Sequence, residues 1–281
     1  MRTSSTEGAL AQTVFVAFDT ETTGLFAGVD RIVEVAAVVF RGADILSEHE
    51  QLIDPGIPIP APVQAINNIT DQMVRGMPSI EEALPDFLTV LDQGTPVAHN
   101  APFDVGFLCP DIERLGLAAP DTPVLDTRLL AKRAFPGRQS YSLDNLAREL
   151  CRDQRGGARA HRALADARTC AALLRACAAK LGAHGPLSVP DLVRLSGPRL
   201  GFLADAPRLP RLAAALDLAL RAGSFVEIQY LSSQGERTVR EIRPVSFAML
   251  GSAPAISAFC RLRGETRTFR LDAIQAIRSL P

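Results

Sequence analysis

The chain has 281 residues, of which 47% are hydrophobic and 22% are charged, and its formal net charge at pH 7 is −1. This composition is typical of a globular protein with a buried core, and the length suits one large domain or two modest ones. No apolar run is long enough to cross a bilayer, and the polar start MRTSSTEG lacks the pattern of a secretory signal. We therefore expect no membrane association.

The cysteines indicate a reducing environment. The chain contains five of them, none in a C-x-x-C spacing, which argues against a zinc site and against a disulfide framework. Cys170 and Cys177 lie in an apolar helical stretch and are expected to be core residues. The chain is therefore expected to be cytoplasmic.

Charge is distributed unevenly along the chain. Residues 221–281 contain nine arginines and five acidic residues, a net charge of +4, whereas residues 1–220 contain 21 basic and 26 acidic residues, a net charge of −5. If the acidic part acts on an anionic substrate, metal cations are needed between the two.

In chain order, the first part of the sequence predicts strands followed by mixed helices. An apolar run rich in β-branched residues predicts a strand at 13–18, and further strands are predicted at 31–40, 44–53 and 95–98. A helix is predicted to begin after Ser79, which would cap it together with Glu82 at the third helical position. Further helices are predicted over 104–115, 141–150 (with Ser142 as cap) and 163–181. This order favours an α/β layer structure.

The pattern changes in the last third of the chain. Glycine and proline concentrate between about 182 and 210, which predicts a linker with at most one short helix near 190–195. A predicted helix over 211–222 then precedes alternating segments that are typical of a small antiparallel β domain. The expected organisation is a tail at 1–12, an α/β domain at 13–182, a linker at 183–210 and a β domain at 211–281.

The stretch FDTETTGL places Asp19 and Glu21 two residues apart at the end of a predicted strand. Alternation along the strand points both carboxylates to one face. Like charges this close repel unless a cation lies between them, and hard divalent cations prefer such oxygen ligands. The pair alone also fits a polar strand end with two solvated acids.

Two further stretches contain candidate site residues. In HNAPFDVGFL, Asp104 lies among apolar residues, where an unpaired buried carboxylate would be costly. In HRALADA, His161 and Asp166 are separated by five positions, or roughly 140° around a continuous helix. Both reach one site only if His161 lies on the preceding loop, which the sequence DQRGGARA favours. A solvated loop histidine is the alternative interpretation.

These residues lie in three motifs, in the order D-x-E-T-T-G-L, H-N-A-P-F-D and H-R-A-L-x-D-A. Together the motifs resemble those of the DEDD exonuclease superfamily, histidine type. Proofreading (epsilon) subunits of bacterial replicative DNA polymerases belong to this superfamily, and the resemblance covers roughly residues 13–180. It implies an RNase H-like fold, a mixed sheet flanked by helices, and metal-dependent 3′–5′ exonuclease activity that releases nucleoside 5′-monophosphates. DNA 3′ ends, single-stranded by preference, are the expected partner, and no polymerase partner is evident. The alternatives are an exoribonuclease that trims short RNAs or tRNA ends, and a binding regulator with an inert front domain.

The resemblance also implies roles for the acidic and histidine residues. Asp19 would bridge two Mg²⁺ or Mn²⁺ ions, and Glu21 and Asp166 would complete the ligands of one of them. Asp104 would hold the second ion through water. His161 would accept the proton of the attacking water, because its ordinary pKa lies near neutrality.

Substrate contacts follow from the same resemblance. The residues expected to bind substrate are Thr22, Thr23, Gly24, Leu25, Asn100 and Phe103. Backbone at the first four would meet the 3′-terminal nucleotide, with Leu25 wedged against the last bases. His99 and Asp126 are expected to be structural, and the sequence assigns no role to Glu34.

Residues 213–281 resemble a WYL domain, the small Sm/SH3-like β module, in FVEIQY, REIRPVSFAMLG and RTFRLDAI. The name-giving triplet aligns on Pro254, Ala255 and Ile256, so ligand binding through that triplet is not expected. The basic side chains are candidates for a surface that binds single-stranded nucleic acid or a nucleotide: Arg243, Arg261, Arg263, Arg267 and Arg270. A solvated strand face with salt bridges is the alternative.

Overall fold

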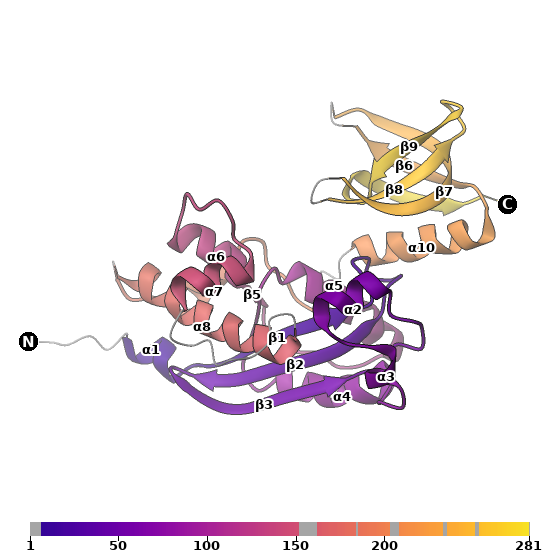
Figure 1. Ribbon diagram of the computed structural model, residues 1–281. Helices are drawn as coiled ribbons and strands as arrows, with labels where there is room; N and C mark the ends of the chain where they lie inside the picture. The colour runs from indigo at the N-terminus through magenta and orange to yellow at the C-terminus, as the bar shows by residue number, and fades with distance from the viewer. Residues whose placement is uncertain are drawn as a thin grey trace, which may run out of the picture. The chain divides into compact units, whose positions relative to one another are not determined.

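The computed structural model describes residues 7–151, 162–183, 185–202, 208–232, 235–250 and 253–280 (Figure 1). The chain forms two compact units. Unit 1 comprises Met1–Gly24 and Arg31–Ala206, and unit 2 comprises Leu25–Asp30 and Pro207–Pro281. The short segment that follows the first strand therefore groups with the C-terminal β structure. No helix of the described residues is long and apolar enough to span a membrane.

Unit 1 is built on one mixed sheet of five strands in the order β3-β2-β1-β4-β5. The strands are β1 (Val14–Thr22), β2 (Ile32–Arg41), β3 (Asp44–Leu52), β4 (Thr95–Ala98) and β5 (Leu125–Asp126). Strands β1, β2 and β3 pair antiparallel, whereas β4 is parallel to β1 and β5 is parallel to β4. The mixed α/β fold predicted from the sequence is confirmed.

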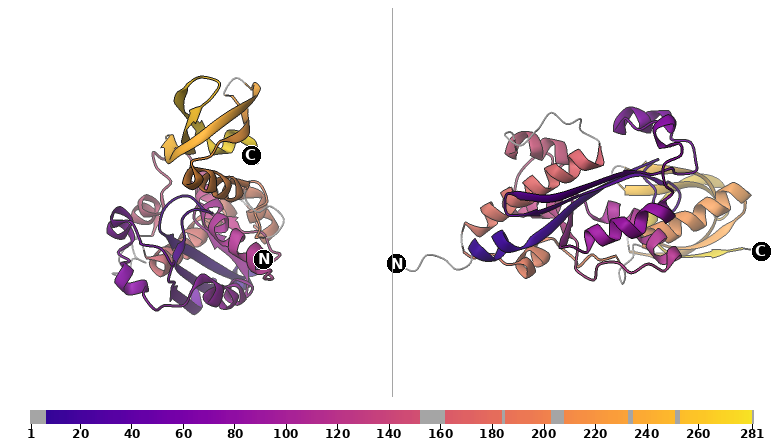
Figure 2. Two further views of the ribbon diagram at one scale, coloured as in Figure 1. Left: turned by 90° about the vertical axis from the view of Figure 1, so that its right-hand side faces the viewer. Right: turned by 90° about the horizontal axis from the view of Figure 1, so that it is seen from below.

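Helices cover both faces of this sheet (Figure 2). The helices described in unit 1 are α1 (Glu7–Gln12), α2 (Ala61–Asn67), α3 (Asp71–Val74), α4 (Ile80–Leu91), α5 (Pro102–Leu115), α6 (Thr127–Ala134), α7 (Leu143–Leu150), α8 (Ala163–Gly182) and α9 (Val189–Leu195). Alternation along β1 explains the two layers. Phe15 belongs to the same buried cluster as Leu174 of α8, whereas the Phe18 ring lies 6.4 Å from that of Phe87 in α4. Odd positions of β1 thus face α8, and even positions face α4.

Local signals set several helix starts. Ser79 and Glu82 form the predicted capping box at the start of α4. The Ser142 hydroxyl accepts a hydrogen bond from the backbone N–H of Asn145 and so caps α7. Cys170 and Cys177 are buried, as predicted, and both are free thiols.

The segment predicted to be a linker contributes to the core of unit 1. It contains α9, and both Leu192 and Phe202 are buried. The backbone N–H of Val124 donates to the carbonyl of Leu200 at 2.8 Å, and the Cys109 thiol donates to the carbonyl of Phe202. Residues 185–202 are therefore an integral, packed part of unit 1.

Unit 2 contains a second, fully antiparallel sheet in the order β10-β6-β7-β8-β9. Its elements are α10 (Arg208–Ala222), β6 (Val226–Leu231), β7 (Arg237–Leu250), β8 (Ala253–Cys260), β9 (Glu265–Arg270), a 3₁₀ turn (Leu271–Ala273) and β10 (Ile274–Ser279). Leu212 and Leu216 of α10 are buried in the core of this unit. Phe26 packs there too, with its ring centroid 4.9 Å from that of Phe247. The small antiparallel β domain expected from the alternating segments is confirmed.

Candidate active site

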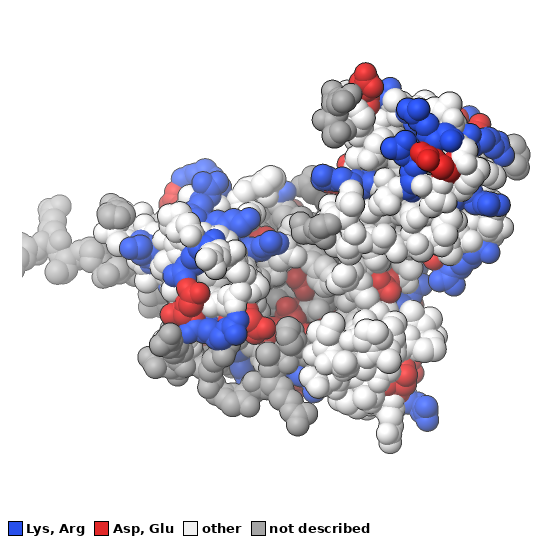
Figure 3. All heavy atoms as spheres, turned by 45° about the horizontal axis from the view of Figure 1, so that its top comes forward, with Lys and Arg blue, Asp and Glu red and all other residues white. Residues whose placement is uncertain are grey.

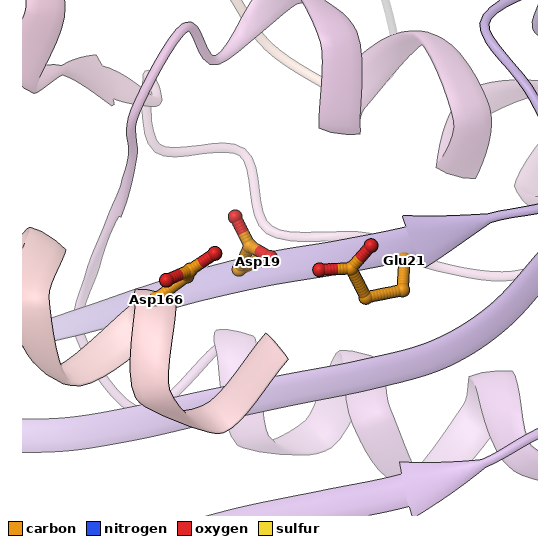
Figure 4. A group of neighbouring side chains, drawn as sticks. All are labelled: Asp19, Glu21 and Asp166. Carbon is orange, nitrogen blue, oxygen red and sulfur yellow. The ribbon is translucent and has the colours of Figure 1, made fainter. Parts of the chain in front are cut away.

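Three carboxylates converge beside the central strand (Figure 4). Asp19 and Glu21 occupy odd positions of β1 and so face α8, whose first turn carries Asp166. Each of the three offers an oxygen, and these oxygens all lie within 4.8 Å of one another. The arrangement follows from two local facts, namely the alternation of the strand and the start of the helix just before Asp166.

The electrostatics of this cluster are unfavourable for three bare anions. Burial raises the pKa of Asp19 well above its ordinary value, and the charges of Asp104, Asp166 and Glu21 raise it further. Burial, followed by the charge of Asp166, raises the pKa of Glu21 to about 8. Because carboxylate oxygens are the preferred ligands of hard divalent cations, the donor set fits such a cation.

Asp104 approaches the same strand from the opposite face. It lies in the first turn of α5 and is buried. Its Oδ1 accepts two hydrogen bonds from Thr20, one from the backbone N–H at 2.9 Å and one from the hydroxyl at 2.8 Å. Burial raises the pKa of Asp104 to about 7, although the bonds from Thr20 lower it. Asp104 adjoins the cluster, since its charge acts on Asp19, but its oxygens are not within the group of three.

His161 lies outside the described residues. Its neighbour Arg162 is described and immediately precedes α8.

The turn after β1 uses its threonine hydroxyls internally. Thr22 and Thr23 are buried. The Thr22 hydroxyl donates to the carbonyl of Gly24 at 2.5 Å, and the Thr23 hydroxyl accepts from the backbone N–H of Arg31 at 2.9 Å. Leu25 follows and is 59% exposed.

His99 is held by two protein partners. Its Nδ1 lies 2.9 Å from the hydroxyl of Thr127, and its Nε2 lies 3.0 Å from the carbonyl oxygen of Tyr141. Burial lowers the pKa of His99, which favours the neutral ring. Both nitrogens are thus engaged in holding the loop, as expected for a structural histidine.

Asn100 has backbone of positive φ, 66°, next to the helix that carries Asp104. Its N–H donates to Oδ1 of Asp126 at 3.2 Å, and its side-chain oxygen accepts from Arg128 at 2.9 Å. Asp126 also caps α6 through the backbone N–H of Arg128. Asn100 is one of the residues expected to bind substrate, and the sequence did not indicate that Arg128 contacts it. No local motif marks it, because its partner is 28 positions away.

Phe103 is half-buried, and its ring centroid lies 4.9 Å from that of Phe107. Both rings belong to α5, on either side of Asp104 in the sequence. The first turns of α5 thus carry two aromatic rings in contact with each other.

The fold and the acidic cluster together define a nuclease. Residues 16–174 match the profile of the exonuclease family, and residues 211–279 match that of the WYL domain. The chain belongs to the exonuclease family.

Several known proteins are similar to part of this chain. It is 42% identical over 158 residues to the DNA polymerase III subunit epsilon of Treponema pallidum, a match that covers 56% of this chain and 72% of that protein. The DNA polymerase III PolC-type of Lacticaseibacillus paracasei is 41% identical over 140 residues, which is 50% of this chain. The match covers 10% of that relative, so the chain spans about a tenth of the length of the PolC-type protein.

A solved structure is similar in fold to part of this chain. It is exonuclease X in complex with 5′ overhanging duplex DNA, with 31% sequence identity and a TM-score of 0.51. The superposition covers 65% of this chain and 99% of that chain.

Proposed function

We propose that this chain is a metal-dependent 3′–5′ exonuclease that hydrolyses phosphodiester bonds at single-stranded or frayed 3′ ends of DNA. The observation that carries the proposal is the convergence of Asp19, Glu21 and Asp166 within 4.8 Å on one face of the central strand. A structural role does not account for this cluster, because each charge raises the pKa of its neighbours. The products would be nucleoside 5′-monophosphates and a shortened strand.

The carboxylates would hold two divalent cations, Mg²⁺ or Mn²⁺. Asp19, Glu21 and Asp166 form the converging set, and Asp104 stands next to Asp19 as the fourth carboxylate. When bound, such cations orient an attacking water and stabilise the charge that develops on the phosphate.

The remaining residues of the motifs would orient substrate and move a proton. The imidazole of His161 would accept the proton of the attacking water, because its ordinary pKa lies near the working pH. The exposed Leu25 would contact the terminal bases, and the half-buried ring of Phe103 would limit access of water. Thr22, Thr23 and Gly24 would present backbone to the terminal nucleotide, with Asn100 at the groove.

The nature of the relatives supports DNA as the substrate. The similar proteins include a polymerase epsilon subunit and an exonuclease solved with duplex DNA. A role in repair or proofreading follows from this comparison as part of the proposal. The exoribonuclease alternative shares the same chemistry and differs in the sugar that is accepted.

We further propose that unit 2 supplies a surface for the nucleic-acid strand. A cavity of about 720 Å³ on this unit is lined by four arginines and by Tyr230 and Phe269, among others. The arginines are Arg240, Arg263, Arg267 and Arg270. Guanidinium groups suit phosphate through their fixed fork of donors. Basic side chains, with some acidic ones between them, are visible on this unit in Figure 3.

The five arginines expected from the sequence divide into two groups. Arg243 and Arg261 are not part of the cavity lining and lie over the ring of Phe225, at 5.6 and 4.1 Å from its centroid. The alternative, a solvated strand face with salt bridges, also has support, since Arg270 pairs with Asp272 at 2.5 Å. The proposed surface therefore rests on Arg263, Arg267 and Arg270 together with Arg240.

The test is degradation of labelled oligonucleotides by the full chain, with Mn²⁺ or with excess chelator. A 5′-labelled single strand of DNA should give a descending ladder, and a 3′-labelled one should release labelled mononucleotide at once. The double variant Asp19→Asn with Asp166→Asn, purified in parallel, controls for contaminating nuclease. Full activity in chelator would sink the proposal, as would binding without cleavage. Faster loss of an RNA of the same sequence would favour the exoribonuclease.

A further inference from the structure

Glu34 is a fully buried carboxylate at the third position of β2, a strand that is otherwise apolar up to its last residue. Its partners come from a segment 128 positions away. The Arg162 Nε donates to both carboxylate oxygens, at 3.0 and 3.1 Å, and its Nη2 also bonds Oε1. The backbone N–H of Ala163 donates to Oε2 at 2.9 Å. A charge buried this deeply is tolerated because it is paired and hydrogen-bonded.

These bonds replace the side-chain cap that the start of α8 lacks. The N-cap residue of the helix is Arg162, whose side chain does not cap it. The first N–H groups of a helix have no partner within the helix, and a side-chain oxygen normally satisfies one of them. Here Glu34 satisfies Ala163 from another strand, while its ion pair holds the cap residue. Arg162 is held a second time by Glu50 of β3, at 3.2 Å.

The same contact links the two elements that carry the acidic cluster. Glu34 is the register partner of Glu21 in the pairing of β1 with β2. On the helix side, the backbone N–H of Asp166 donates to the carbonyl of Arg162 at 3.1 Å. The position of Arg162 therefore sets the position of the turn that carries Asp166.

We propose that Glu34 is a positioning residue of the cation site, which fixes the first turn of α8 through Arg162 and Ala163 so that Asp166 meets Asp19 and Glu21. This inference rests on the proposed function in one respect, namely that the cluster binds divalent cations.

A purely electrostatic effect of the pair makes a different prediction. The charge of Glu34 raises the pKa of Glu21, and the charge of Arg162 lowers it. If only charge mattered, removal of Glu34 would weaken binding of a cation, whereas removal of Arg162 would strengthen it. If the pair positions the helix, both removals weaken binding, and removing both residues together costs no more than removing one.

The experiment measures Mn²⁺ affinity of the full chain by calorimetry without substrate. The variants are Glu34→Gln, Arg162→Gln and the double variant. Each should bind Mn²⁺ on the order of tenfold more weakly, the effect typical of lost outer contacts at metal sites. The matched control is Glu48→Gln, which removes an exposed ion pair between β3 and Arg168 of the same helix. This control should change the affinity less than twofold.

Thermal unfolding in chelator shows which variants are folded. If Glu34→Gln does not fold, Arg162→Gln decides, because that side chain is partly exposed. Unchanged affinity in Glu34→Gln, or tighter binding in Arg162→Gln, would overturn the proposal. Failure of the proposed function would be seen in the wild-type chain itself, as a lack of Mn²⁺-dependent cleavage.

Discussion

Thr20 gives two hydrogen bonds to one oxygen of Asp104, and Thr20 is the residue between Asp19 and Glu21. The central strand thus serves the site on both faces. At its odd positions, Asp19 and Glu21 face α8. At the even position between them, Thr20 donates hydrogen bonds to Asp104 of α5. These two hydrogen bonds offset part of the cost of burying the Asp104 carboxylate.

The hydroxyl of Thr20 is therefore expected to matter to activity. Thr20→Val keeps the shape of the side chain and removes one donor to Asp104. We expect a loss of about 1 kcal/mol of stability, or roughly 2–4 °C in Tm. The cleavage rate should fall on the order of tenfold, because Asp104 is less firmly oriented. Thr20→Ser restores the hydroxyl and should recover most of both, and a valine variant with full activity would contradict this role.

Stability without metal should depend on pH with a definite sign. Folding raises the pKa of Glu21 from 4.5 to about 8, and it raises the pKa of Asp19 as well. The unfolded chain therefore ionises these groups first. In chelator, their contribution should reduce the free energy of unfolding as pH rises from about 4.5 to about 8.

Asp19→Asn isolates this effect from other titrations. Melting curves of the variant and the wild type in chelator should diverge as pH rises, with the variant more stable at pH 8. Addition of Mn²⁺ should raise the Tm of the wild type and leave that of the variant nearly unchanged. Parallel curves across the pH range would show that the carboxylates do not repel in the folded protein.

His161 is expected to act in the chemical step. His161→Ala should retain Mn²⁺ binding and slow single-turnover cleavage by on the order of 10²–10⁴-fold. The wild-type rate should rise with pH through roughly 6–7, the range of an ordinary histidine, and the variant should lose this rise. His99→Gln is the control, because both ring nitrogens of His99 bond to protein. It should lower Tm and keep the pH profile, whereas an unchanged rate in His161→Ala would return that residue to a solvated loop.

The features that the sequence predicted well are those with local patterns. The Ser79 box, the apolar strands and the placement of Asp19 and Glu21 on one face all follow from spacing within a few residues. The bonds of Glu34 to Arg162 and of Thr20 to Asp104 join positions 128 and 84 residues apart. No periodicity encodes such pairs, so they required the folded chain.

The short helix predicted near 190–195 is present as α9, but helix α6 and the packing of residues 185–202 escaped prediction. Helix α6 begins after its N-cap residue Asp126, and the sequence around Asp126 resembles an ordinary strand end. The Pro and Gly residues between 182 and 210 predict a linker, because they interrupt regular secondary structure. Composition does not indicate that Leu192 and Phe202 are buried in the folded chain. Tertiary burial overrode composition there.

This packing makes a prediction about truncation. A chain that ends after Ala206 should melt at a higher temperature than one that ends after Gly182. The shorter chain loses the buried side chains of Leu192 and Phe202, worth about 1.5–3 kcal/mol each. Both chains lack the sheet of unit 2, so the comparison isolates residues 183–206. Equal melting temperatures would show that this segment does not stabilise unit 1.

The arginines of the cavity in unit 2 should determine how binding depends on salt. Each phosphate contact to a single strand adds about 0.7 to the slope of log affinity against log salt concentration, so removal of contacts makes the dependence shallower. Replacing Arg263 and Arg267 with Ala in the full chain should reduce the slope of single-stranded DNA binding by roughly one. Replacing Arg243 and Arg261, which lie against Phe225 outside the cavity, removes the same charge and should change the slope less. Because both double variants lower the net charge equally, a difference between them reports position and not overall attraction. Equal slopes in the two variants would reduce the cavity to one part of a diffuse basic surface, and slopes equal to that of the wild type would leave unit 2 without a nucleic-acid contact.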